Sequence, residues 1–116
     1  MSLLDTDAVI DLLRRRAYEP GSISAITLVE VLRGISGERR EGVKGLLEES
    51  FDMVGLDNRV ILTYCDLYRM LRERGEVVPD ADLLIAATAI SRDVPLVTGD
   101  RHFQRLVEFG LKIGRN

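Results

Sequence analysis

The hydrophobic residues of this chain change period several times along the sequence. Leu3 and Leu4 form a short apolar run, and the apolar residues that follow them recur at helical spacing. The same switch occurs after residues 22–26, 51–56 and 95–98. Strands that alternate with helices need crossover connections and therefore pair in parallel. The pattern predicts an α/β protein, a three-layer α/β/α arrangement with a mostly parallel central sheet of about four or five strands.

Helices are expected between these short runs, and a last strand is expected at 111–113. The chain has 116 residues, of which 46% are hydrophobic, so residues 1–116 are predicted to form one domain around a single core. The expected helices run from Ile10 to Ala17, from Thr27 to Gly34 or Gly37, through Val43, Leu46 and Leu47, from Val60 to Leu71 with Gly75 closing it, from Asp80 to Ile90, and from Arg101 to Val107.

Composition excludes several classes of protein. The sequence contains no apolar run long enough to span a membrane and no export signal at its start, so no membrane association is expected. A single cysteine, Cys65, forms no internal disulfide, which agrees with a cytoplasmic location. The formal net charge is −3, which argues against nucleic-acid binding by bulk charge but leaves room for a local basic patch.

Four carboxylates stand where strands end or the following helices begin. Asp5 directly follows the first apolar run, and Glu30 lies about one helical turn after the second. Asp82 lies in the first turn of a predicted helix, and Asp100 closely follows the strand before it. Because the carboxyl ends of parallel strands meet at one edge of the sheet, these acids are expected to converge there.

Each acid also has a purely structural interpretation. Thr27 and Glu30 match a helix capping box, in which the two side chains bond reciprocally to backbone amides. Asp80 is interpreted as a helix start with Asp82 favoured by the helix dipole, and Asp100 as the cap of the next helix. Taken singly, the capping interpretation is favoured for each residue.

Taken together, converging carboxylates indicate a bound cation. Several ionised acids within a few ångströms repel one another unless a cation lies between them or one holds a proton. An oxygen-rich site without a nearby lysine suits Mg²⁺ or Mn²⁺, whereas Cys65 and His102 stand alone and offer no zinc site. Such a metal supports phosphoryl transfer, because it lowers the pKa of water and neutralises charge on the phosphate.

Four motifs in this order resemble the PIN-domain ribonucleases, and specifically the VapC-type toxins of prokaryotic toxin–antitoxin pairs. The resemblance covers nearly the whole chain, and its strength lies in the order of the motifs rather than in any one of them. The motifs are Leu4-Asp5-Thr6-Asp7; Ser24 and Thr27 with Glu30-Val31-Leu32-Arg33-Gly34; Asp82-Leu83-Leu84-Ile85-Ala86-Ala87-Thr88-Ala89; and Leu96-Val97-Thr98-Gly99-Asp100 with Phe103.

The resemblance implies a metal-dependent endoribonuclease that forms a homodimer and is held inactive by a small cognate antitoxin. It implies that the catalytic, metal-binding acids are Asp5, Glu30, Asp82 and Asp100. Thr98, Thr6 and Thr27 would supply hydrogen bonds behind these ligands. The RNA substrate would be held by basic residues close to the acids, namely Arg33, Arg101, His102 and Arg105.

One residue departs from the family pattern. The family usually carries asparagine where this chain has Asp7, and the added charge would either strengthen metal binding or cap the first helix. The capping interpretation is favoured for Asp7, and Asp80 is likewise expected to start a helix rather than to bind metal.

Three other functions can be fitted to parts of the sequence. A phospho-acceptor receiver domain would use Asp5, Asp7, Asp57, Thr98 and Lys112, but the expected Met-Pro turn is absent after Asp57 and three of the acids stay unexplained. Another alternative, a PIN fold without catalysis that serves only in binding, is disfavoured because all four acids are present.

A haloacid-dehalogenase-type phosphatase would use the Asp5-Thr6-Asp7 opening. It also needs a lysine ahead of its last acidic motif. Lys44 is the available candidate, and it lies on a predicted helix rather than at a strand end. This alternative is therefore weaker than the receiver.

Overall fold

All five strands of the central sheet run parallel in the computed structural model, which describes residues 1–114. The predicted α/β fold is therefore confirmed, with a sheet order of β3-β2-β1-β4-β5. The two-residue β1 occupies the centre, where Leu3 pairs with Ser22 on one side and with Leu96 on the other. The strands are β1 (Leu3–Leu4), β2 (Ser22–Ser24), β3 (Asp52–Val54), β4 (Leu96–Val97) and β5 (Ile113–Gly114).

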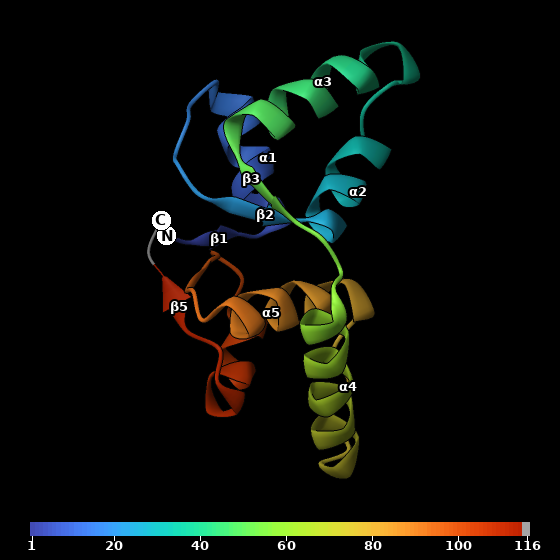
Figure 1. Cartoon of the computed structure of the whole chain (residues 1–116), viewed down its shortest axis with the longest axis vertical. Helices are drawn as coiled ribbons and strands as arrows, with labels where there is room; N and C mark the ends of the chain where they lie inside the picture. The colour runs from blue at the N-terminus through green and yellow to red at the C-terminus, as the bar shows by residue number, and fades with distance from the viewer. Residues whose placement is uncertain (115–116) are drawn as a thin grey trace.

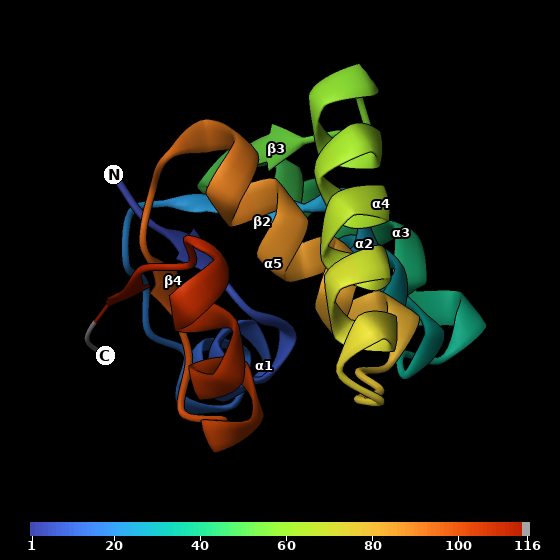
Figure 2. The same ribbon diagram turned by 90° about the horizontal axis from the view of Figure 1, so that it is seen from below.

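Helices connect the strands on both faces of the sheet. Figure 1 shows α1, α2 and α3 on one side of the strands and α4 and α5 on the other. Figure 2 views the second side, where α4, α5 and η1 lie in front of the sheet. The helices are α1 (Thr6–Arg15), α2 (Ala25–Arg33), α3 (Gly37–Ser50), α4 (Asn58–Glu73), α5 (Asp80–Arg92) and the 3₁₀ helix η1 (Arg101–Phe109).

The two leucines of β1 supply one side chain to each of two cores. Leu3 packs into the cluster formed by α4, α5 and η1, whereas Leu4 packs with α1, α2 and α3 on the other face. Successive residues of a strand point to opposite faces, so a two-residue strand is enough to anchor both layers. Each leucine is only 1% exposed, and burial of such a side chain stabilises the fold by about 1.5–3 kcal/mol.

The second helix begins earlier than the sequence predicts. Ser24 caps α2 by accepting a hydrogen bond from the Ile26 amide at 3.0 Å, so Ala25 and Ile26 leave the predicted strand and enter the helix. The predicted capping box of Thr27 and Glu30 is therefore wrong. Thr27 is fully buried in the first turn of α2, which leaves both side chains free for other contacts.

The remaining strand bounds differ from the predicted ones by a few residues. The β3 strand covers 52–54 rather than 51–56, and β5 covers 113–114 rather than 111–113. Leu111 lies 2% exposed in the core just before β5, so its hydrophobicity reflects packing rather than strand pairing. Across residues 1–114, no helix is both long enough and apolar enough to cross a membrane.

Gly21 leaves no space for a side chain between β1 and β2. A Cβ atom at this position would lie 2.5 Å from Leu4 Cδ1 and 3.0 Å from the Ser2 carbonyl oxygen. We expect Gly21→Ala to destabilise the protein by about 1–3 kcal/mol, because the added methyl group overpacks the centre of the sheet. Denaturant unfolding followed by circular dichroism measures this change.

The matched control is Gly42→Ala, in the middle of α3, where a Cβ atom would meet nothing within 4 Å. This substitution is expected to stabilise the protein by about 0.5–1 kcal/mol, because alanine is the better helix former. Equal effects of the two substitutions would contradict the packing assigned to Gly21.

Candidate active site

A pocket of about 240 Å³ opens at the carboxyl edge of the sheet, where the sequence places its four acids. All four lie on its wall, and Asp7 joins them. In residues 1–114, Arg33 is the single basic side chain among the residues that line it. We call this cavity the acid pocket; its lining is Asp5, Thr6, Asp7, Ile10, Glu30, Arg33, Asp82, Ile85, Asp100 and Phe103.

Asp5 is the most deeply buried of these acids. It is 3% exposed, and its backbone amide donates to the Val97 carbonyl at 3.1 Å, which fixes it against β4. One carboxylate oxygen accepts from the Ala8 amide at 2.8 Å and thereby caps α1, and the other accepts from the Thr98 hydroxyl. The strand and the helix together hold this carboxylate in one orientation.

Thr98 links two of the acids. While its hydroxyl donates to Asp5, its oxygen accepts from the Asp100 amide at 2.9 Å. Asp100 in turn caps η1 by accepting from the His102 amide at 2.9 Å, and His102 Nδ1 lies 2.9 Å from the same carboxylate oxygen. The predicted cap at Asp100 is therefore present, and it serves to aim the carboxylate at the pocket.

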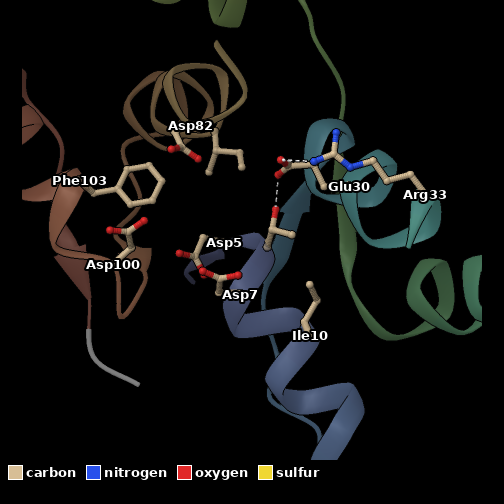
Figure 3. Close-up of a pocket in the computed structure, with 10 residues that line it drawn as sticks. Asp5, Asp7, Ile10, Glu30, Arg33, Asp82, Asp100 and Phe103 are labelled. Atoms are coloured by element: carbon tan, nitrogen blue, oxygen red, sulfur yellow. Dashed lines mark hydrogen bonds and ion pairs between the residues drawn. The ribbon is translucent and has the colours of Figure 1, made fainter. Parts of the chain in front are cut away.

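Glu30 is held by a separate group of residues on the opposite wall. Its carboxylate accepts from the Thr6 hydroxyl at 2.6 Å, and Thr6 lies 3.2 Å from the hydroxyl oxygen of buried Thr27. Arg33 Nη2 lies 3.5 Å from the other Glu30 oxygen. Glu30 is thus partly neutralised by Arg33 of its own helix, and Figure 3 marks this contact with a dashed line.

Burial and mutual repulsion make two of the acids reluctant to ionise. Burial raises the pKa of the Asp5 carboxyl, the negative charges of Asp7 and Asp100 add to the rise, and the Thr98 and Ala8 hydrogen bonds oppose it. The pKa of Asp82 is also raised, first by burial and then by the negative charges of Glu30, Asp100, Asp5 and Asp7. A cation in the pocket would relieve this repulsion.

The donor set has the chemistry of a site for a hard divalent cation, since it consists of carboxylate oxygens. In the structure, however, no three potential ligands within residues 1–114 lie close enough together to hold an ion. Figure 3 shows why: Asp82 lies across the pocket from Asp5 and Asp7, and Glu30 is drawn toward Arg33. Asp5, Asp82, Asp100 and Glu30 would be the residues to hold such an ion.

Asp7 has a different place from the one favoured by the sequence. Asp5 caps α1, so Asp7 lies in the first turn of that helix and lines the acid pocket. The capping interpretation of Asp7 is therefore wrong, because α1 begins at Thr6, two residues earlier than a helix capped by Asp7 would. Asp80 does start its helix, as predicted, and its carboxylate accepts from the Tyr64 hydroxyl at 2.6 Å.

The other basic candidates lie outside the acid pocket. Arg101 is exposed at the start of η1, and His102 and Arg105 line an adjoining pocket that also contains Asp82. Arg33 is the exception, since it reaches the acid pocket itself. The sequence did not single out Ile10 and Ile85, although their positions beside Asp7 and Asp82 on helical faces could have indicated their place in the pocket wall.

The residues required by the rival functions do not converge. Asp57 caps α4 through the Val60 amide at 3.0 Å and pairs with Arg92 at 2.6 Å, which lowers the pKa of its carboxyl. Lys112 pairs with Asp93, and Lys44 pairs with Glu48 within α3. None of these side chains lines the acid pocket, so neither the receiver nor the dehalogenase-type arrangement is formed by the described residues.

Comparison with known proteins identifies the family of this arrangement. The family model described as "PIN domain" matches residues 3–108. The chain belongs to the PIN-domain family. A curated PIN relative, Ribonuclease VapC1 of Methanocaldococcus jannaschii, is 44% identical over 115 residues, which cover 96% of this chain and 85% of the relative. The resemblance inferred from the sequence motifs is confirmed.

Solved structures agree with this PIN assignment. VapBC-1 from nontypeable Haemophilus influenzae superposes with a TM-score of 0.83 at 24% identity over 98% of this chain and 96% of that chain, which supports the fold alone. VapBC-5 from Mycobacterium tuberculosis, a member of the VapBC family of toxin–antitoxin systems, has a TM-score of 0.70 at 26% identity. The latter match covers 98% of this chain and 95% of that chain.

The raised pKa of Asp82 has a consequence for stability without metal. The folded protein binds this proton more tightly than the unfolded chain, whose ordinary pKa is 3.8, so ionisation of Asp82 costs folding free energy. This loss of folding free energy appears as the pH rises from 3.8 through the pKa that Asp82 has in the folded protein. In EDTA, Asp82→Asn is therefore expected to melt at a higher temperature than the wild type near neutral pH, with the gain shrinking toward pH 3.8.

The control for this measurement is Asp66→Asn, an exposed aspartate on α4 away from the pocket. Its melting temperature is expected to follow that of the wild type at every pH. A lower melting temperature for Asp82→Asn than for the wild type at neutral pH in EDTA would show that repulsion at the pocket does not outweigh the helix-dipole contribution of this residue.

Proposed function

We propose that the chain is an endoribonuclease that hydrolyses RNA phosphodiester bonds with Mg²⁺ or Mn²⁺ held by Asp5, Asp82, Asp100 and Glu30. The observation that carries this proposal is the crowding of five carboxylates around one pocket with a single arginine on its wall. An arrangement in which burial and like charges raise the pKa of two acids is typical of functional sites. The 44% identity to a ribonuclease supports the same activity.

The residues divide the work according to how they are held. When bound, a divalent ion lowers the pKa of the attacking water and neutralises charge on the scissile phosphate. Asp5 is the fixed ligand, because the Thr98 hydroxyl and the Ala8 amide set the direction of its two oxygens. Within residues 1–114 no side chain donates a hydrogen bond to the Asp82 carboxylate, which would therefore be free to complete the ligand set of a bound ion.

Glu30 has two partners that decide when it can act. The Thr6 hydroxyl fixes one of its oxygens, and Arg33 competes with any cation for the other. We assign Glu30 to orient the attacking water or to bind a second ion, and Thr6 and Thr27 to position it. Thr98 has the matching role for Asp5 and Asp100.

We further propose that the chain is the toxin of a toxin–antitoxin pair, located in the cytoplasm, with a small cognate antitoxin as its partner. The VapBC structures among its relatives support this assignment. Apolar side chains exposed on α2, α3 and α4 and on the loop after α1 offer contact surface for an antitoxin and for a second copy of the chain in the predicted homodimer. They include Tyr18, Val29, Leu46, Ile61 and Leu62.

Replacing Asp5 tests the enzymatic part of this proposal. Partner-free protein is expected to cleave a labelled single-stranded RNA when Mg²⁺ or Mn²⁺ is present and to stop in excess EDTA. Asp5→Asn keeps the size of the side chain and one acceptor oxygen for the Ala8 amide, but it removes the charge and places an NH2 donor beside the Thr98 hydroxyl, which can turn to accept from it. We expect a loss of kcat of about 100-fold or more with the fold retained. Gel assays of product formation and circular dichroism measure the two effects.

Asp66→Asn serves again as the matched control and is expected to cleave like the wild type. Undiminished cleavage in EDTA, or by the Asp5 variant, would contradict the metal mechanism. Absence of cleavage in the wild type with either ion, with RNA binding intact, would instead identify the chain as a PIN fold that binds without catalysis.

A further inference from the structure

A second pocket, of about 230 Å³, lies directly beside the acid pocket. Its wall joins the loop between α4 and α5 to the exposed side of η1. We call it the flanking pocket; its lining is Val77, Val78, Pro79, Asp82, His102 and Arg105. Asp82 lines both pockets, so the two cavities meet at that carboxylate.

The loop that forms one wall is fixed from both ends. Gly75 ends α4 with a φ of +68°, which turns the chain away from the helix axis. Arg105 on η1 donates to the Val77 carbonyl at 3.3 Å and lies 3.9 Å from a carboxylate oxygen of Glu76. Val78 packs on the main core beneath the loop. The wall is thus built into the fold.

The exposed side of this wall is apolar. Val77 is 85% exposed, and Pro79 is exposed beside it. The same pocket is lined by His102, whose imidazole is 76% exposed and whose Nδ1 lies 2.9 Å from an Asp100 carboxylate oxygen. A flat group that enters this pocket would bury surface against an imidazole and two apolar side chains without any hydrogen bond.

The two pockets differ in the charged residues that line them. The acid pocket has five carboxylates and one arginine, which is paired with Glu30. The flanking pocket has one carboxylate on its wall, the shared Asp82, together with Arg105 and His102, which lie near Glu76 and Asp100 respectively. A polyanion that extends from the acid pocket toward η1 therefore meets fewer carboxylates and a second arginine.

We propose that the flanking pocket is a nucleobase subsite, which binds the base of the nucleotide next to the scissile phosphate of a single-stranded RNA. This inference rests on the proposed ribonuclease activity and adds the path of the substrate to it. His102 stacks on one face of the base, Val77 and Pro79 contact the other, and Arg105 lies at the backbone phosphate. Bases of single-stranded RNA are free to stack in this way, whereas paired bases are not.

The volume sets the scale of the ligand. Pockets that enclose drug-sized molecules run from about 300 to 1,000 Å³, so the flanking pocket at about 230 Å³ holds a single base rather than a stacked pair. Because it touches the acid pocket at Asp82, the base it holds belongs to a nucleotide directly flanking the cleaved bond. The pocket thus contributes to the choice of cleavage position.

Substrates that lack one base test this subsite. The cleavage site is first mapped in a labelled single-stranded RNA of fixed sequence, and each nucleotide flanking the cleaved bond is then replaced in turn by an abasic residue. We expect one such replacement to raise KM about tenfold for the wild type, the effect of losing one stacked base. For His102→Ala and Val77→Asp, KM for the intact RNA is expected to rise by a similar factor, and the abasic replacement then has little further effect.

Arg69→Ala, at an exposed position on α4, is the matched control and is expected to show the full abasic effect. The proposal would be overturned if no abasic replacement raised KM for the wild type, or if the increase were undiminished in both pocket variants. If the wild type cleaves no RNA, the proposed activity fails. The subsite is then tested by fluorescence anisotropy on the wild type, His102→Ala and Val77→Asp, with single-stranded RNAs that carry the abasic residue at each position in turn. No abasic effect on binding by the wild type, or an effect that persists in both variants, would overturn it.

Discussion

The buried carboxylate of Asp5 is the constraint around which the carboxyl edge of this protein is arranged. An ionised carboxylate at 3% exposure is costly unless hydrogen bonds or a cation offset its loss of water. The Ala8 amide and the Thr98 hydroxyl supply the hydrogen bonds, and their geometry requires that α1 start immediately after β1 and that β4 lie next to β1. The central position of β1 therefore follows from both core packing and the site.

The same edge shows how an acidic protein can act on a polyanion. Burial and neighbouring negative charges raise the pKa values of Asp5 and Asp82. A divalent cation in the acid pocket would reduce this repulsion, whereas an anion would add to it. Arg33 lies on one wall of the acid pocket, whereas His102 and Arg105 lie beside that pocket on η1. We thus assign metal binding and binding of the RNA backbone to adjacent surfaces. A protein with a net charge of −3 can then bind RNA through local basic residues.

The sequence predicted the architecture and the four acids because both follow from simple periodicity and from where strands end. It failed at contacts that connect distant elements. The capping box of Thr27 and Glu30 was plausible locally, but Ser24 starts the helix, and Glu30 bonds to Thr6 across the pocket. Asp7 matched a helix cap by spacing, but a strand of two residues gave that place to Asp5. The flanking pocket arises from Arg105 and a loop that local sequence patterns do not connect.

The central claim is that these carboxylates close around a divalent cation, although the acids stand apart in the structure described. Electron paramagnetic resonance of Mn²⁺ titrated into partner-free protein tests this most directly, because the signal of the free aqueous ion falls as the ion binds. We expect saturable binding that is lost in Asp5→Asn. Absence of binding by the wild type, or equal binding by the Asp5 variant, would contradict it.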